Sequence, residues 1–103
     1  MTSPHLVQVL ATLSNPHRMR VVAALAAERG YVSDLARRLG ISRALLQLHL
    51  KKLEAAGLVS ATLEFSADGK ALKFYELIPF DLRLTPETVA LAARTLPEES
   101  DTP

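Results

Sequence analysis

The sequence predicts a small, mainly α-helical domain that carries one small β-hairpin, and three observations support that class. Leucine and alanine dominate a 103-residue chain that is 49% hydrophobic and only 5% aromatic, which favours helices packed through aliphatic side chains. A capping residue precedes proline at Ser3-Pro4, Asn15-Pro16 and Thr85-Pro86, as is typical of helix starts. An Asp-Gly pair at 68–69 separates two alternating segments, as expected for a hairpin turn.

Composition restricts the class of function. The chain has no cysteine and a formal net charge of +1, so disulfides, thiolate metal sites and cysteine nucleophiles are excluded. It has no apolar run of about 18 residues and no signal-peptide pattern, and we therefore expect a soluble, cytoplasmic protein without membrane contact. The length fits a single domain, predicted over residues 1–96, and the polar tail 97–103 is expected to be disordered.

Two helices are expected in the first part of the chain, each with an apolar stripe. The first covers roughly residues 4–13, and the second runs roughly over 16–29 and ends at Gly30. The stripes consist of Leu6, Val9, Leu10 and Leu13 in the first helix, and of Met19, Val22, Ala23 and Ala26 in the second. This spacing is typical of amphipathic helices that bury one face.

The next segment predicts a short strand and a short helix. Residues 31–32 are enough for a single strand pairing, and Ser33 is then expected to cap a helix over 34–39. Gly40 can take the left-handed conformation that ends this helix. The turn is therefore specified by residue chemistry.

A fourth helix is predicted over 43–56, because Ser42 can cap its first turn and Gly57 can end it. Three leucines at spacings of four and three are expected to face the core, namely Leu46, Leu50 and Leu53. The residues expected on the outward face are Arg43, Ala44, Gln47, Lys51 and Leu48. Two short helices joined by a tight glycine turn are the layout of a helix-turn-helix.

A hairpin and a last helix complete the predicted elements. Apolar residues alternate with polar ones at Val59, Ala61, Leu63 and Phe65, which indicates a half-buried strand. The turn at 67–70 leads to a second strand over 72–77. A hairpin directly behind a helix-turn-helix is a wing, and Thr85 is expected to cap a final helix over 86–96.

In this order of elements, residues 12–77 resemble the ArsR-like winged helix-turn-helix transcriptional regulators. The resemblance rests on LSNPHRMR at 13–20, LA at 35–36, LGIS at 39–42, LKKL at 50–53 and AAGLV at 55–59. It implies a homodimer that places the Ser42-led helix of each subunit in successive major grooves of double-stranded DNA. The wings would reach flanking minor grooves or phosphates.

Many members of that family are repressors released by a metal or another inducer, but this chain departs from the metal-sensing pattern. The family's thiolate motif would fall at 33–39, which holds no cysteine, and no histidine follows His49 for the other metal site. The three histidines share no chelating spacing and are interpreted as structural. We therefore expect no metal and no cofactor, and the residues identify no effector.

A local basic surface is the main indication of a DNA partner. Five basic residues and no acidic ones occur from 37 to 52, namely Arg37, Arg38, Arg43, Lys51 and Lys52. Arg43 can bond guanine O6 and N7, Gln47 can bond adenine, and Ala44 can contact a thymine methyl. Lys51 is better placed for a phosphate. The predicted DNA-binding residues are Arg37, Arg38, Ser42, Arg43, Ala44, Gln47, Leu48, Lys51, Lys70 and Lys73.

Four of these cations have a second interpretation. Arg37 and Arg38 end a helix, where a cation stabilises the negative pole by about 0.3 to 1 kcal/mol, so helix stabilisation and phosphate clamping both stay open. Lys70 and Lys73 are typical wing cations, but lysines on exposed strands also deter edge aggregation.

Leu45 and Leu48 stand where polar residues are usual in the family. Leu45 can pack back on the third helix, and Leu48 can touch thymine methyls, a protein partner or a hydrophobic ligand. Alternatively, both simply broaden the buried face. These leucines motivate a second functional hypothesis, in which the chain is a winged-helix protein–protein interaction module.

The terminal helices, 4–13 and 86–96, carry apolar stripes that predict a dimer, although packing within one chain is the alternative. The expected interface consists of Leu6, Val9, Leu10, Leu13, Val89, Ala92, Ala93 and Leu96. No catalytic triad, paired-carboxylate cleft or phosphate loop can be assembled, so we expect no enzyme. We therefore predict a sequence-specific, double-stranded DNA-binding transcriptional regulator that acts as a homodimeric repressor without metal sensing.

Overall fold

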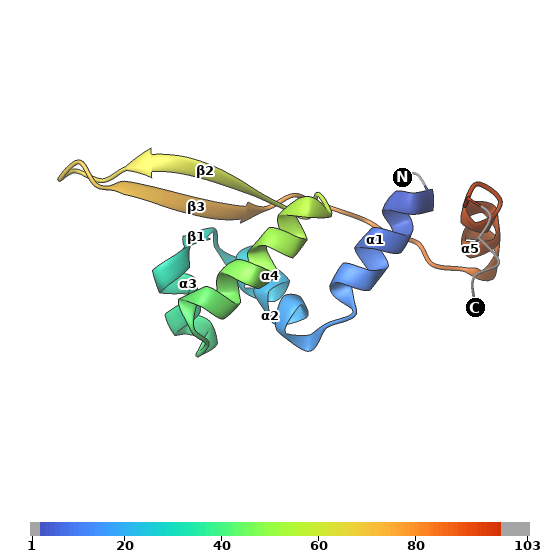
Figure 1. Ribbon diagram of the computed structural model, residues 1–103, viewed down its shortest axis with the longest axis horizontal. Coiled ribbons are helices and arrows are strands. Elements are labelled where there is room, and N and C mark those ends of the chain that lie inside the picture. Colours follow the sequence, from blue (N-terminus) through green and yellow to red (C-terminus); the bar gives the residue numbers. More distant parts are fainter. Residues whose placement is uncertain (1–2, 98–103) are drawn as a thin grey trace.

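The computed structural model describes residues 3–97, so the predicted disordered tail, apart from Pro97, lies outside the described residues. Within them the chain forms five helices and three strands: α1 (Ser3–Leu13), α2 (Pro16–Ala27), β1 (Gly30–Tyr31), α3 (Val32–Leu39), α4 (Arg43–Ala55), β2 (Val59–Phe65), β3 (Ala71–Leu77) and α5 (Pro86–Ala93). The molecule is elongated, at 55 × 29 × 22 Å. The β2–β3 hairpin projects from one end and α5 lies beside α1 at the other (Figure 1).

Helix α2 begins as predicted but buries a different face. The side-chain oxygen of Asn15 accepts the backbone N–H groups of His17 and Arg18 and so caps the helix. The helix ends at Ala27, two residues earlier than predicted, because the backbone is already extended at Glu28. The predicted buried stripe was wrong, since Met19 is 59% exposed.

The buried line of α2 consists of Val21 and Leu25, which are one turn apart. This line meets α4 and β3, against which α2 packs. The small, mostly apolar residues all around this helix give a weak amphipathic signal. Tertiary packing therefore decides which face is buried.

The helix-turn-helix consists of α3, a glycine turn and α4. Gly40 has φ +69° and ends α3 in the predicted left-handed conformation. The Ser42 hydroxyl accepts the backbone N–H of Leu45 at 3.1 Å, which confirms the predicted cap of α4. Ser33 does not cap α3, because the helix begins one residue before it and Tyr31 occupies the cap position without a side-chain bond.

The early start of α3 follows from strand pairing. Gly30 and Tyr31 pair with Tyr75 and Phe74 of β3, so the extended chain ends at Tyr31 and the helix begins immediately afterwards. The predicted single strand pairing is confirmed, although it uses residues 30–31. The sheet order is β1-β3-β2, and all pairs are antiparallel.

The inner face of the hairpin is buried only at its base. Val59 is buried and Ala61 is half-buried, whereas Leu63 and Phe65 are 59% and 70% exposed. The prediction of a half-buried strand is therefore wrong for its outer half. The physical reason is visible in Figure 1, where the hairpin extends beyond the helices that cover its base.

The core lies where the helices meet the base of the sheet. Leu46, Leu50 and Leu53 are fully buried, which confirms the predicted inner face of α4. The other buried hydrophobic residues are Val9, Val21, Leu25, Leu35, Ala36, Ala56, Leu58, Val59 and Tyr75. This core holds α4 rigidly with its opposite face turned to solvent.

Candidate nucleic-acid interface

The outward face of α4 is exposed over most of its length. Arg43, Ala44, Gln47 and Lys51 are all exposed, in the orientation that the leucine spacing predicts. Leu48 lies among them and is 61% exposed, so it does not broaden the buried face. The surface thus offers a guanidinium, an amide, an ammonium and two apolar groups along one helix.

A groove separates this face of α4 from the wing. Its outer part is lined by Ser33 of α3, Arg43 and Gln47 of α4 and Lys73 of β3, together with neighbouring residues of these elements. Its inner part is lined by Gln47, Lys51, Lys73, Tyr75 and the acidic Glu54. Helix α4 and the wing therefore contribute to one surface, and Lys73 is the cation of the wing that lies beside the helix.

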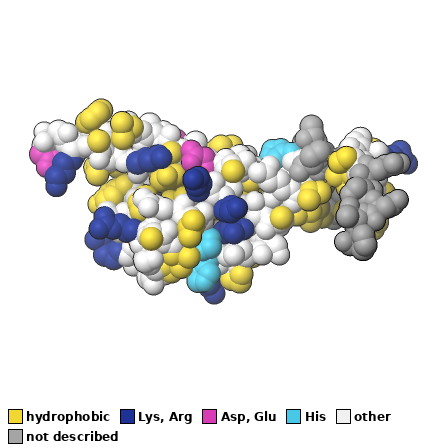
Figure 2. All heavy atoms as spheres, viewed as in Figure 1, with side chains coloured by type: hydrophobic (Ala, Val, Ile, Leu, Met, Phe, Trp, Pro, Cys, Tyr) yellow, Lys and Arg dark blue, Asp and Glu magenta, His cyan; other side chains and the backbone are white. Residues whose placement is uncertain are grey.

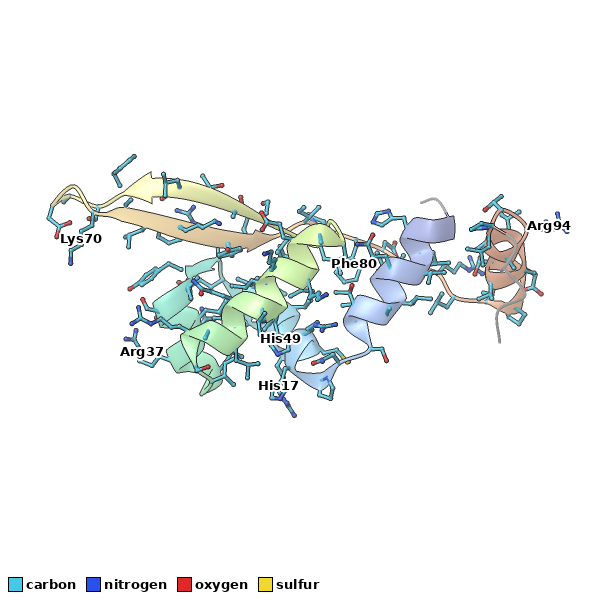
Figure 3. All side chains as sticks on the ribbon, viewed as in Figure 1. His17, Arg37, His49, Lys70, Phe80 and Arg94 are labelled. Atoms are coloured by element: carbon cyan, nitrogen blue, oxygen red, sulfur yellow. The ribbon has the colours of Figure 1, made fainter. Side chains whose placement is uncertain are left out.

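Figure 2 shows lysine and arginine side chains distributed over the visible face, from the hairpin tip across α3 and α4. Lys70 lies at the tip of the hairpin (Figure 3). Its backbone N–H donates to the Ser66 hydroxyl at 3.1 Å. The same hydroxyl donates to the carboxylate of Asp68, and this bond together with the N–H of Lys70 lowers the pKa of Asp68. The turn is thus internally bonded, and it presents a lysine outward.

The two arginines at the end of α3 differ in their partners. Asp34 contacts both of them, at 2.9 Å from Arg37 and at 3.5 Å from Arg38. Arg38 also donates to the backbone oxygen of Ala24 at 3.2 Å and thereby ties α3 to α2. The side chain of Arg37 is 73% exposed and extends from α3 (Figure 3). The spacing of three and four residues from Asp34 is the sequence signal that indicates these pairs.

The wing is anchored to the body by a contact that the sequence does not indicate. Arg29 donates to the carboxylate of Glu64 at 2.6 Å and lies 4.6 Å from the centroid of the Phe74 ring. The hydrogen bond from Arg29 lowers the pKa of Glu64. The residues are 35 and 45 positions apart from Arg29, so only the folded hairpin brings them together.

A buried histidine links α4 to α2 and α1. Arg18 donates its Nε–H to Nδ1 of His49 at 3.3 Å and a second N–H to the backbone oxygen of Thr12 at 3.2 Å. The ring of His17 stacks on that of His49 with centroids 5.5 Å apart (Figure 3). Burial, followed by the charge of Arg18, lowers the pKa of His49.

The start of α1 lies against the end of α4. His5 Nε2 is 2.9 Å from the backbone oxygen of Ala56, and Gln8 donates to that of Ala55 at 3.1 Å. These bonds satisfy carbonyl groups that the helix end leaves free. The orientation of α4 therefore depends on α1.

Two further properties concern residues 3–97. No group of three or more His, Cys, Asp or Glu side chains in this part of the chain is arranged to hold a metal ion. None of its helices has the length and apolar character needed to cross a membrane.

Comparisons with known proteins agree with this architecture. Residues 13–60 match the family model of a helix-turn-helix domain. The solved structure of reduced HlyU from Vibrio cholerae aligns with this chain at a TM-score of 0.62 and 25% sequence identity. The alignment covers 89% of this chain and 85% of the HlyU chain. An ArsR-like transcriptional regulator from Rhodococcus sp. has a TM-score of 0.64 and 27% identity, covering 89% of this chain and 76% of its own. No curated protein sequence matches the chain.

A third solved structure is the homodimeric winged helix-turn-helix DNA-binding domain of a possible ArsR-family regulator from Mycobacterium bovis. It has a TM-score of 0.66 and 24% identity, covering 88% of this chain and 74% of its own. The mainly α-helical class with a winged helix-turn-helix, predicted from the sequence, is confirmed.

Proposed function

We infer that this ArsR-like winged helix-turn-helix transcriptional regulator binds double-stranded DNA in a sequence-specific manner, as a homodimeric repressor that senses no metal. The observation that carries the proposal is the groove shared by Arg43 and Gln47 of α4 and Lys73 of the wing. It combines groups that read bases with a group that binds phosphate, on one exposed surface. The solved structures that this chain resembles include an ArsR-like transcriptional regulator, and we assign no catalytic role to the chain.

The position of each side chain along α4 supports a division of labour. Arg43 and Gln47 lie in the first turns of the helix, which is the part that enters a major groove in helix-turn-helix proteins. Arg43 is assigned to guanine and Gln47 to adenine, with Ala44 against a thymine methyl. Lys51 lies two turns from Arg43 and is assigned to a phosphate.

The remaining predicted DNA residues take supporting roles. The hydroxyl of Ser42 is used in capping α4 and orients its first turn. Arg37 is exposed and is assigned to a phosphate, whereas Arg38 is assigned a structural role because it bonds Asp34 and Ala24. Lys70 and Lys73 are assigned to phosphates beside the wing.

The homodimer is supported by apolar side chains that the terminal part of the chain leaves exposed. Helix α5 has eight residues and no buried side chain, although isolated helices of this length are unstable in water. Val89 and Leu91 of α5 are exposed, and so is Val7 of α1. Leu96 is also exposed, but it lies after the helix, which ends at Ala93 and not at residue 96 as predicted. A second copy would cover them. The relative from Mycobacterium bovis is a homodimer.

The proposed interface therefore consists of Leu6, Leu10, Leu13, Val89, Ala92, Ala93 and Leu96, to which we add Val7 and Leu91. Val9 is left out, because it is fully buried in the core of its own chain. The absence of a cysteine supports a repressor that senses no metal through thiolates. A cytoplasmic location stays a prediction, and no effector is assigned.

A protein–protein interaction module is the second candidate, and one observation favours it. Leu48 is exposed in the middle of the reading helix, and Leu45 beside it is 37% exposed. Under this alternative, Leu48→Ser abolishes capture of the partner. Under the DNA proposal, the same change alters only the affinity for DNA.

The proposal is tested with the purified protein and genomic DNA fragments. Selection of bound fragments should return one recurring site, and fluorescence anisotropy should give an affinity that falls steeply with salt, because phosphate contacts release counterions. Arg43→Ala combined with Lys51→Ala should weaken binding at least about ten-fold, whereas Arg20→Ala, an exposed cation of α2, should not. Absence of duplex binding at low salt, or equal binding by the double variant, would falsify the proposal.

A further inference from the structure

We propose that a groove between α1, α2 and the segment after β3 binds a small amphipathic anion, namely a carboxylate with an alkyl chain of about eight to ten carbons. The alkyl chain lies in an apolar hollow, and the carboxylate faces Arg20 at the end of that hollow. The inference does not depend on DNA binding, because it concerns a different surface of the molecule.

The first part of the groove is an apolar hollow of about 420 Å³, a size typical of sites for small organic ligands. Five of its six lining residues are apolar: Leu10 and Leu13 of α1, Met19 and Val22 of α2, and Phe80 of the segment after β3, which lies beside α1 (Figure 3). Met19 and Phe80 are 59% and 38% exposed, so water reaches these walls in the isolated chain. An alkyl chain in the hollow removes apolar surface from water.

The second part of the groove is a polar hollow that shares Ser14 and Met19 with the first and adds Asn15, Pro16 and Arg20. It holds three kinds of hydrogen-bond donor, namely a hydroxyl, an amide NH₂ group and a guanidinium. The side-chain oxygen of Asn15 accepts backbone N–H groups of α2, which leaves its NH₂ group as the part that can face a ligand. A carboxylate accepts bonds from all three groups, and a guanidinium can bind both of its oxygens.

The charge around the groove selects an anion. No acidic residue occurs in the first 27 residues of the chain, so α1 and α2 carry only basic and neutral side chains. In the part of the chain that the structure describes, Arg20 makes no ion pair, whereas Arg18 bonds His49 and the backbone of α1. Asp81 follows Phe80 in the sequence but lines neither hollow. An alkyl carboxylate therefore complements both the apolar hollow and the cation at its end.

A second copy of the chain is the alternative occupant of the groove, because two residues that line it, Leu10 and Leu13, also belong to the proposed dimer interface. All residues of that interface are apolar, so they offer no side-chain acceptor to the donors of the polar hollow. None of the residues that line the polar hollow belongs to the interface. A carboxylate uses both hollows, whereas this interface leaves the polar one unused.

The test is a titration of the full-length protein with decanoate at pH 7, where the carboxylate is ionised, in the absence of DNA. Backbone amide shifts in two-dimensional NMR spectra report where decanoate binds, and isothermal calorimetry reports its affinity. Octanoate has two methylene groups fewer, and decylammonium has a similar chain with the opposite charge. All three ligands are used below the concentrations at which they form micelles.

We expect saturable binding of decanoate, with the largest amide shifts over residues 13–22 and around Phe80. When each methylene group is counted as half buried in an open groove, octanoate should bind about four-fold more weakly. Decylammonium should bind at least about ten-fold more weakly than decanoate, because its charge faces that of Arg20.

Variants of exposed residues, which should all fold, separate the two parts of the groove. Arg20→Ala should weaken decanoate binding about five-fold, as expected for an exposed ion pair, and should not weaken decylammonium binding. Arg94→Ala removes an exposed arginine at the far end of the molecule (Figure 3) and should change neither affinity. Met19→Gln gives the apolar hollow a polar wall and should reduce the difference between decanoate and octanoate, whereas Met19→Leu should retain it.

Several outcomes would overturn the proposal. Equal affinities for decanoate and decylammonium would reduce the interaction to apolar adhesion, and amide shifts confined to α4 and the wing would place the ligand elsewhere. If decanoate does not bind and Met19→Gln lowers the sedimentation coefficient of the protein, a second copy covers the groove instead. DNA affinity is measured in separate titrations, so the failure of this inference is distinguishable from the failure of the proposed DNA binding.

Discussion

Nε of Arg18 lies 3.3 Å from Nδ1 of His49, so a side chain of α2 donates to an imidazole that is buried within α4. Nδ1 must therefore be unprotonated, which leaves the proton of the neutral ring on Nε2. Nε2 is buried and has no hydrogen-bond partner among the described residues. A neutral ring fits this site, and a charged ring would face the guanidinium of Arg18.

This relationship predicts a loss of stability in acid. Burial and Arg18 lower the pKa of His49 in the folded protein from 6.5, so the unfolded chain binds more protons below that pH. The free energy of unfolding should fall as the pH drops below about 6.5 and level off below the folded-state pKa. Urea unfolding between pH 5 and 8 measures this free energy. His49→Leu, which retains His17, should show a flatter dependence of the free energy of unfolding on pH than wild type.

The arginines that end α3 predict opposite phenotypes. Arg37→Ala should lower the free energy of unfolding by at most about 0.5 kcal/mol, because it removes only an exposed pair with Asp34, and it should lower the salt dependence of DNA binding by about one phosphate contact. Arg38→Ala should lower the free energy of unfolding by about 1 kcal/mol, since it removes a bond to the backbone oxygen of Ala24. Thermal melts and salt titrations of both variants separate the roles. Equal behaviour of the two would contradict the assignment.

The fold is predictable from the sequence because local residue chemistry specifies its turns. Ser42 and Gly40 mark the helix-turn-helix, and the Asp-Gly turn marks the wing, each through backbone geometry that few other residues adopt. The inner face of α4 was also predictable, since its leucines repeat at helical spacing. These features need no knowledge of distant residues.

The errors arose where distant packing decides. The pattern of α2 admits several faces, and only contact with α4 and β3 selects Val21 and Leu25. The alternation of β2 is correct, but it does not tell where the helices beneath the hairpin end. Leu63 and Phe65 were therefore expected on the buried face of a half-buried strand, whereas both are exposed. The partner of His49 is 31 positions away.

The wing anchor predicts a local effect on dynamics. Arg29→Ala removes the bond to Glu64 and the contact with the Phe74 ring, both at the outer sheet face. Amide hydrogen exchange in β2 should become faster while α4 stays protected, because the leucine core is untouched. Glu64→Gln should produce the same pattern more weakly. Uniform acceleration over the whole chain would contradict a local anchor.

The turn between α3 and α4 predicts a cost that depends only on the backbone. Gly40 has φ +69°, and no atom lies within 4 Å of the Cβ that a side chain would add. Gly40→Ala should therefore lower the free energy of unfolding by about 1 kcal/mol through backbone strain alone. Gly40→Asn should cost less, since asparagine tolerates this conformation. Chemical denaturation of both variants measures the difference, and equal costs would point to a contact instead of strain.

The exposed face of α5 predicts that stability and DNA binding both depend on protein concentration. If α5 and α1 are covered by a second copy, Leu91→Glu should convert the dimer to a monomer, because it places a charge in an apolar interface. Sedimentation velocity would detect the change in mass. The monomer should bind DNA much more weakly, since only one half of a two-fold site is engaged. Glu87→Gln, in the first turn of α5 and outside the proposed interface residues, is a control that should stay dimeric. A wild-type protein that sediments as a monomer at micromolar concentration would refute the dimer without affecting the assignment of the α4 surface.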